Sequence, residues 1–264
     1  LQAENPALYV SLRDQFIPVF EYMYTYDNAS LPGVRNPIWW QTTVSSAGNL
    51  TSCIYRIFGK SFKEKDKKLL GVPFAQFLKL NSEFRYHYRI DKNQMIASRI
   101  AGGVIWSYGN ATTAPYTEQF YIGGANSVRA FSARSIGPGG YPPNKEDKFS
   151  FINHVGDIRM EANVEYRFRI ISDLHGAVFL DAGNVWLMRK EENRPHGELT
   201  LKNFAKQIAL GTGVGLRYDL DFLVFRLDLG IGLHDPYDTC KSGYYNIPKF
   251  KDSMALHFAI GYPF

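Results

Sequence analysis

One cation flanked by apolar side chains stands in the middle of the stretch Tyr121–Pro138, where the chain reads Val128-Arg129-Ala130-Phe131. Glycines punctuate this stretch on both sides, at Gly123-Gly124 and at Gly137-Pro138, and they allow the backbone to take positive φ. A solvated tip would have little use for two apolar side chains beside an arginine. We therefore expect the stretch to fold back onto a carboxylate that pairs with the guanidinium of Arg129.

Two acids further along the chain are the expected partners of Arg129. Sequence parity places Glu165 and Asp181 on the same polar face of two successive alternating segments. A guanidinium donates two parallel hydrogen bonds to a carboxylate, a role that lysine could not fill equally well. The sequence therefore predicts an enclosed, bidentate pair. We also expect the apolar residues of the tip to pack on a glycine-lined wall: Val128 and Phe131 beside Gly183 and Gly213.

The best candidate for a catalytic group in the sequence is the adjacent pair His234-Asp235 at the edge of a long loop. An Asp–His pair can activate water, but adjacent loop residues are ordinarily just solvated. The chain has no Gly-x-Ser-x-Gly elbow and no His/Cys metal spacing, and its six histidines are scattered. We expect no catalytic residue, no metal site and no cofactor, and we keep a hydrolase as the weakest alternative.

The elements that position these residues are strands with alternating apolar and polar side chains. In Pro73–Ile90, for example, Phe84 and Tyr86 lie on one face and Arg85 and His87 on the other. This segment is far longer than the ~5–6 residues of an ordinary strand. Nine strands are predicted: Gln15–Asp27, Pro37–Gly48, Pro73–Ile90, Ile96–Gly109, Gly156–Ile170, His175–Trp186, Gln207–Tyr218, Phe222–Leu233 and Ala255–Phe264.

Composition narrows the class of protein. Mean hydropathy is slightly negative although 15% of the 264 residues are aromatic, as expected for a sheet with one apolar and one polar face. No run of ~18 apolar residues could form a transmembrane helix. The formal net charge of +5 is spread thinly, and no Lys/Arg-rich arm suggests a nucleic acid partner. The two cysteines, Cys53 and Cys240, are too few for a disulfide framework.

Long strands with one apolar face, aromatic residues near strand ends and alternating short and long connections are typical of a transmembrane β-barrel. In a bilayer every backbone polar group must pair within a closed sheet, and the lipid face must carry no charge. We therefore predict an all-β antiparallel barrel, with a soluble β-sandwich as the weaker alternative. Because nine strands is an odd count, either a strand is missed in Leu1–Arg13 or the chain is the C-terminal part of a larger barrel, which we favour.

A short amphipathic helix is predicted in the loop after the second strand, on residues at helical spacing: Leu50, Cys53, Ile54, Ile57 and Phe58. Cys53 falls on the apolar face and is interpreted as a small hydrophobe rather than a reactive thiol. The charged run Lys60–Lys68 is interpreted as a solvated loop, with contact to anionic lipid head groups as the alternative. Strand parity places this helix and the loop Asp235–Asp252 on the same, extracellular side.

The central stretch resembles the lid loop of the BamA/TamA-type outer-membrane assembly superfamily, which includes the two-partner-secretion transporters. The family's signature is an aromatic-rich strand end, a Gly-Gly pair, then Val-Arg-Gly-Phe/Tyr, then Ile-Gly-Pro. This sequence matches it with Phe120-Tyr121-Ile122-Gly123-Gly124, Val128-Arg129-Ala130-Phe131 and Ile136-Gly137-Pro138, and departs from it at Ala130. The wording Asn-Ser-Val-Arg-Ala-Phe of the tip favours the TamA-like branch.

Further motifs of the family match after the loop. They are an aromatic-x-Asp-x-Gly motif, a glutamate on the first following strand and a terminal aromatic assembly signal: Phe179, Asp181 and Gly183, then Glu165, then Phe264. The resemblance implies that residues 1–264 are the C-terminal portion of an outer-membrane barrel of about 16 strands. It also implies that the periplasmic POTRA repeats and the first barrel strands lie outside this sequence.

The resemblance implies a protein insertase that needs no cofactor, in which client strands enter at a seam between the first and last barrel strands. The last strand would form one lip of the seam, an edge that templates strand addition, with its apolar face toward lipid: Phe258, Ile260, Tyr262 and Phe264. The expected partners are outer-membrane lipids, unfolded client outer-membrane proteins and accessory assembly proteins on the periplasmic side. The alternative is a secretion pore that the same loop plugs, used by an unfolded exoprotein.

Overall fold

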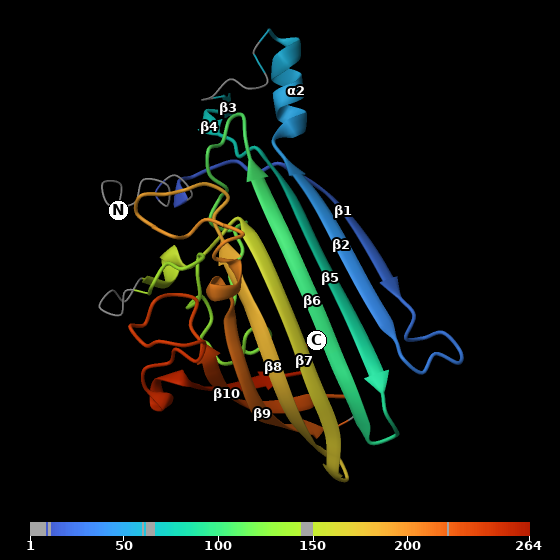
Figure 1. Ribbon diagram of the computed structural model, residues 1–264. Helices are drawn as coiled ribbons and strands as arrows, with labels where there is room; N and C mark the ends of the chain where they lie inside the picture. Colours follow the sequence, from blue (N-terminus) through green and yellow to red (C-terminus); the bar gives the residue numbers. More distant parts are fainter. Residues whose placement is uncertain (1–8, 10–11, 60, 62–66, 144–149, 221) are drawn as a thin grey trace.

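The computed structural model describes residues 9, 12–59, 61, 67–143, 150–220 and 222–264, and these contain one curved antiparallel sheet of nine strands (Figure 1). Neighbours in the chain are neighbours in the sheet, in the order β1-β2-β5-β6-β7-β8-β9-β10-β11. The strands are β1 (Val19–Asp27), β2 (Ile38–Ala47), β5 (Phe77–Arg89), β6 (Gln94–Ser107), β7 (Ile158–Ile171), β8 (Leu174–Trp186), β9 (Ala209–Asp219), β10 (Val224–His234) and β11 (Met254–Ile260). The predicted meander of nine long strands is confirmed.

The smaller elements lie in the connections between these strands. They are α2 (Asn49–Ile57), the two-residue strands β3 (Lys68–Leu69) and β4 (Val72–Pro73), and the 3-10 turns η1 (Ser150–Asn153), η2 (Phe204–Gln207) and η3 (Phe250–Ser253). No helix in the described part of the chain is long and apolar enough to cross a bilayer. A possible extra strand in Leu1–Arg13 falls almost entirely outside the described residues.

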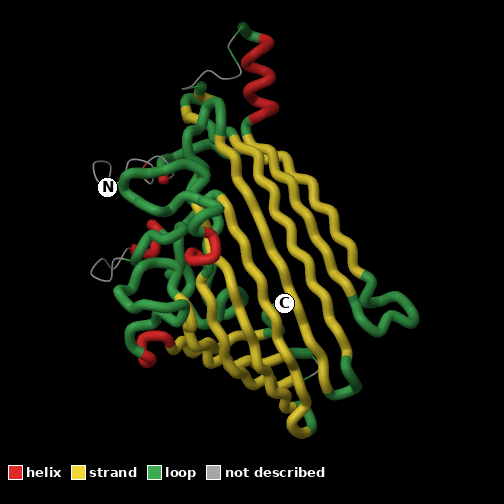
Figure 2. The backbone as a smooth tube through the Cα atoms, viewed as in Figure 1, coloured by secondary structure: helices red, strands yellow, loops and turns green. Residues whose placement is uncertain are grey.

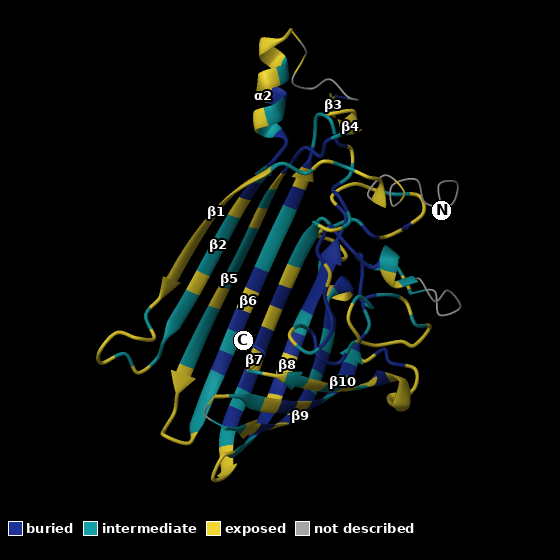
Figure 3. Cartoon of the chain, turned by 180° about the vertical axis from the view of Figure 1, so that it is seen from behind, coloured by how far each residue is buried: buried dark blue, intermediate teal, exposed yellow. Residues whose placement is uncertain are grey.

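The two faces of the sheet differ as the alternation predicts. Along β7, Glu161 and Glu165 are buried on the concave face, whereas Met160 and Val164 are exposed on the convex face. The same alternation continues along β9 and β10, so buried and exposed bands interleave along the strands in Figure 3. Charge is therefore gathered inside the curve, and apolar side chains cover the outside. This inverted distribution suits a sheet whose outer face meets lipid.

The connections separate into two classes, one at each end of the sheet (Figure 2). Long ones, 48–76, 108–157, 187–208 and 235–253, share one end, here called the long-loop end. Shorter ones, 28–37, 90–93, 172–173 and 220–223, share the other, here called the short-turn end. This confirms the predicted alternation, and it places α2 and the loop at 235–253 at the same end.

The predicted helix is present, within a residue at each end, but its apolar face has no cover. Ser52 is the buried residue of α2, whereas Leu50 and Ile57 are 76% and 82% exposed. Cys53, like Cys240, is a free and exposed thiol, so it does not pack as the small hydrophobe we expected. Most of the charged run Lys60–Lys68 lies outside the described residues.

The last strand is shorter than predicted, and one expectation about it was wrong. β11 ends at Ile260, and Gly261, with φ of 85°, turns the chain away from the strand direction. Phe258 and Ile260 remain on the exposed convex face, but Phe264 is only 6% exposed and lies on the concave side. Tyr262 also turns inward, with its ring centroid 4.6 Å from the guanidinium carbon of buried Arg167. Phe264 and Tyr262 therefore do not face lipid as predicted, because the glycine turn breaks the parity on which that prediction rested.

Candidate functional site

The lid loop, residues 121–138, closes on itself at its base. Gly123 and Gly124 have φ values of 97° and 91°, in the left-handed region that favours glycine. The amide of Gly124 donates to the carbonyl of Phe131 over 2.8 Å, and a side chain at Gly123 would collide with the carbonyl of Ser132. The glycine pair thus makes a tight crossing that presents residues 128–131 as a tip.

Arg129 at this tip is fully buried against β7 and β8. Its Nε and Nη2 donate to the two carboxylate oxygens of Asp181 over 2.8 and 2.9 Å, and its backbone amide donates to the same carboxylate over 3.0 Å. Its Nη1 donates to Glu165. The structure therefore brings together the three residues that the sequence singled out, in the bidentate geometry expected for arginine.

The partners of Arg129 are themselves held in place. Asn163 donates to Asp181 over 2.9 Å and also to the carbonyl of Ser127 in the loop, which joins β7, β8 and the tip. The ring of Phe179 stacks beneath the guanidinium, whose carbon lies 3.6 Å from the ring centroid. A cation over an aromatic face is stabilised further where water is excluded, so the site is organised around one charge.

Several charged residues of the site were not predicted from the sequence. Glu165 also accepts from Arg167 and Arg217 over 2.7 and 3.1 Å, and Arg217 donates to Asp228 over 2.5 Å. Arg226 adds a contact of 3.6 Å to Asp228. Arg217, Arg226 and Asp228 lie at buried positions of β9 and β10, but alternation along a strand gives no signal that such residues would join Glu165.

Electrostatics keeps Arg129 charged in this enclosed position. Burial alone would lower the pKa of its guanidinium, but hydrogen bonds and charge from Asp181, followed by those from Glu165, raise that pKa above its ordinary value. The cation therefore cannot escape by deprotonation. Holding it inside the sheet depends on the carboxylates that surround it.

The tip packs on a glycine-lined wall, but not at the glycines we expected. A side chain at Gly230 would strike the backbone of Arg129, and one at Gly211 would strike the methyl group of Ala130. Gly213 instead lies under Phe179 and Gly183 beside Glu161, whereas Phe131 lies near Gly232. Val128 belongs to a buried apolar cluster and Phe131 packs against that cluster. The register of β9 and β10 thus determines which glycines, Gly211 and Gly230, lie against the lid tip.

Ala130, where the lid-loop signature has glycine, fits this wall without strain. It is not among the non-glycine residues with positive φ, so its backbone does not require glycine. Its methyl group occupies the space that Gly211 leaves by having no side chain. The departure from the family signature is therefore matched by a glycine on the facing strand.

The base of the lid loop is anchored by a buried histidine. Nδ1 of His154 hydrogen-bonds the carbonyl of Gly137, and Arg194 donates to the nearby carbonyls of Asn153 and Val155. Burial lowers the pKa of His154, the bond to Gly137 opposes this shift, and the charge of Arg194 reinforces it. The imidazole is thus held in its neutral form at this anchor.

The lid tip also contacts the last strand and the segment after it. Nε2 of His257 on β11 lies 2.9 Å from the carbonyl of Arg129. Arg167 donates to the carbonyl of Phe264 over 3.2 Å, and the Phe264 ring centroid lies 6.0 Å from the guanidinium carbon of Arg129. Lid tip, β7 and the end of the chain therefore form one connected cluster.

His234 and Asp235, the residues considered for hydrolysis, form hydrogen bonds with the surrounding loops. Both ring nitrogens of His234 face backbone carbonyls, those of Tyr244 at 2.6 Å and Lys206 at 2.9 Å, and the ring stacks on Tyr244. Neither nitrogen points at Asp235, whose amide is bound by Asn246. In the part of the chain that the structure describes, no group of three or more His, Cys, Asp or Glu could hold a metal ion.

Comparison with known proteins places this geometry in context. The protein-family model described as the Omp85 superfamily domain matches residues 70–264. The outer membrane protein assembly factor BamA of Nitratidesulfovibrio vulgaris (strain Hildenborough) is 31% identical over 109 residues, which are 40% of this chain and 13% of that protein. The crystal structure of BamA from Haemophilus ducreyi lacking POTRA domains 1–3 has a similar fold, with a TM-score of 0.52 and 14% identity. That match covers 92% of this chain and 42% of the other.

Proposed function

Because this chain belongs to the Omp85 superfamily, we propose that it carries one lip of the seam through which an assembly factor inserts β-barrel proteins. The chain is an outer-membrane β-barrel segment. Unpaired backbone groups are costly in the bilayer core, so further strands would complete the barrel beyond the free edge of β1 and close it weakly against β11. We infer that residues 1–264 form the C-terminal portion of that barrel.

The observation that supports this proposal is the state of β11. It pairs with β10 over seven residue pairs from Phe225↔Ile260 to Ile231↔Met254, and no described strand pairs with its other edge. That edge presents the alternate N–H and C=O groups on which a client strand can add by β-augmentation. Its inward face is meanwhile tied to the lid tip through His257. The lip is thus open on one side and anchored on the other.

The reaction needs no cofactor, because the folding of the client supplies the free energy. A client strand that pairs with β11 satisfies its backbone groups before it meets lipid, where each unpaired group is costly. The exposed face of β11, with Leu256, Phe258 and Ile260, would meet lipid during this exchange. The lid loop would meanwhile hold the wall of β7 and β8 in a fixed shape behind the seam.

Orientation follows from the classes of connection. The long-loop end would lie outside the cell and the short-turn end in the periplasm, as in bacterial barrels with short periplasmic turns. Unfolded client proteins and accessory assembly proteins would then approach the short-turn end. Labelling of Cys240 in intact cells tests this topology, and labelling only after permeabilisation would reverse it. Membership of the TamA-like branch stays a prediction from the amino-acid sequence of the lid tip.

A seam lock tests the insertase. In a full-length protein with Cys53 and Cys240 replaced by serine, one cysteine is placed at Ala259 on β11 and one on the first barrel strand. We expect partial cross-linking and capture of client chains at the seam. The cross-linked fraction should lose client insertion, and reduction of the disulfide should restore it. A control pair at Val214 and Leu229, which are register partners on β9 and β10, should leave insertion intact.

The lock also separates the insertase from the secretion pore. A pore would pass its exoprotein through the lumen that the lid loop fills, so closing the seam would leave its transport unchanged. Complete cross-linking of the seam with full activity would therefore count against lateral insertion and favour the pore.

A further inference from the structure

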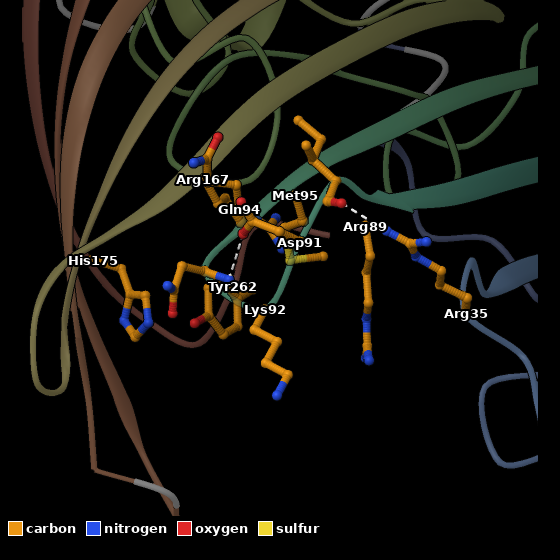
Figure 4. Close-up of a pocket in the computed structure, with 11 residues that line it drawn as sticks. Arg35, Arg89, Asp91, Lys92, Gln94, Met95, Arg167, His175 and Tyr262 are labelled. Atoms are coloured by element: carbon orange, nitrogen blue, oxygen red, sulfur yellow. Dashed lines mark hydrogen bonds between the residues drawn. The ribbon is translucent and has the colours of Figure 1, made fainter.

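A cavity of about 660 Å³ opens at the short-turn end (Figure 4), and it shares Arg167 with the cluster around the lid tip. One wall is the turn 90–93 with Arg89 and Lys92, and Arg35 reaches it from the turn between β1 and β2. The opposite wall is formed by Arg167, His175 and Tyr262. Its charged lining residues are thus four cations and one acid, Asp91.

Two of these cations, Arg89 and Lys92, do not stabilise the fold through side-chain contacts with described residues. The side chains of Arg89 and Lys92 form no hydrogen bond or ion pair with any other described residue, and Figure 4 shows both directed to the same side, away from the strands. Arg35, by contrast, donates to the carbonyl of Ile90 over 2.6 Å. Asp91 cannot balance the charge, because it is one carboxylate among four cations, and one of its oxygens accepts from the amide of Asn93 in its own turn.

The cavity continues toward the end of the chain. Tyr262 lies in the opposite wall, two residues after β11 ends, and its hydroxyl donates to Asp219 over 3.2 Å. Its ring centroid lies 4.6 Å from the guanidinium carbon of Arg167. Nδ1 of His175 is buried there without a hydrogen-bond partner among the described residues. A ligand in this cavity would therefore lie next to the segment that follows the seam lip.

We propose that this cavity binds the carboxylate side chains of an acidic polypeptide segment, with Arg89 and Lys92 as the primary contacts. The planar fork of Arg89 suits a carboxylate and the ammonium of Lys92 adds a second charge. The cavity lies on the concave, aqueous face of β5, since Arg89 shares its parity with Glu83 and Arg85, so a polypeptide in the lumen reaches it before a lipid does. The inference rests on the proposed function, because client chains would arrive at this end.

The test is a binding measurement on the full-length protein in detergent micelles. The probe is a fluorescein-labelled peptide of alternating glutamate and glycine, with glutamine and lysine versions of the same length as controls. The variant Arg89→Gln/Lys92→Gln removes both contacts, and Lys249→Gln/Lys251→Gln removes the same charge at the exposed long-loop end. We expect the first variant to bind the acidic peptide about tenfold more weakly and the second to bind it like the parent.

Three results would overturn the inference. They are equal binding of the acidic and glutamine peptides, an unchanged affinity in Arg89→Gln/Lys92→Gln, or displacement of the peptide by inorganic phosphate at the peptide's own concentration, which would mark a general anion site. Client insertion is measured separately on the same variants. Loss of insertion with unchanged peptide affinity contradicts the inference alone, whereas failure of the seam lock contradicts the proposed function alone.

Discussion

The lid loop and the segment 48–76 with α2 are both connections at the long-loop end, but only the lid loop folds back onto the concave face of the sheet. The lid loop places a fully buried arginine among acids on β7 and β8, whereas α2 leaves the strands with its apolar face exposed. Apolar residues alone therefore did not draw a loop onto this sheet. Around Arg129 the concave face is polar and charged, so it accepts a loop that brings a counter-charge, and the apolar residues that are buried with this loop form the cluster that contains Val128.

Neutralising the acid that holds Arg129 should produce the largest effect. Asp181→Asn keeps the shape of the side chain but leaves the buried guanidinium without its bidentate partner, so we expect the free energy of unfolding to fall by about 3–5 kcal/mol. Urea titration in micelles measures it. Glu192→Gln on the exposed loop after β8 is the control, with a change within about 0.5 kcal/mol. A loss at Asp181 no larger than the control would show that the lid is not held by this charge.

Filling the glycine wall should produce the next largest effect. Gly211→Ala would push a methyl group into that of Ala130, and overpacking of this kind costs about 1–3 kcal/mol. Ala130→Gly should restore most of the loss when combined with Gly211→Ala, because it reopens the same space. If the second change rescues nothing in the urea titration, the tip does not rest on Gly211.

Acidification should loosen the base of the lid by a smaller amount. The folded pKa of His154 lies below its ordinary value of 6.5, so the folded state binds fewer protons than the unfolded state in that window. Stability from this group is present above pH 6.5 and is lost as pH falls toward the folded pKa. His154→Gln should flatten that part of the pH profile of unfolding. If the free energy of unfolding depends on pH equally steeply in the variant, the pH dependence comes from a group other than His154.

The smallest effect is expected on the other side of the comparison, at α2. Ile57→Ser should change the free energy of unfolding by no more than about 0.5 kcal/mol, because the residue is 82% exposed and covers no core. The same titration measures it. A loss above 1 kcal/mol would mean that α2 packs against the protein in solution and would remove the contrast with the lid loop.

The strands and the central residues of the site could both be predicted from the sequence, for the same physical reason. Period-2 alternation fixes which side chains share a face, so Arg129, Glu165 and Asp181 could be assigned to one interior. It could not reveal that Arg217 and Asp228 join them, because that depends on the register and curvature of β9 and β10. Phe264 was misplaced although Gly261 and Pro263 interrupt the strand pattern, a warning that parity does not continue through such residues.

The central claim is that Arg129 and Asp181 act as one enclosed unit that holds the lid loop in the lumen. A double-mutant cycle with Arg129→Ala, Asp181→Ala and the combined variant measures their coupling directly, by urea unfolding in micelles with client insertion measured in parallel. The account predicts that the double variant is little worse than either single variant, since each single change already deprives a buried charge of its bidentate partner. Strictly additive losses in stability and insertion would contradict it.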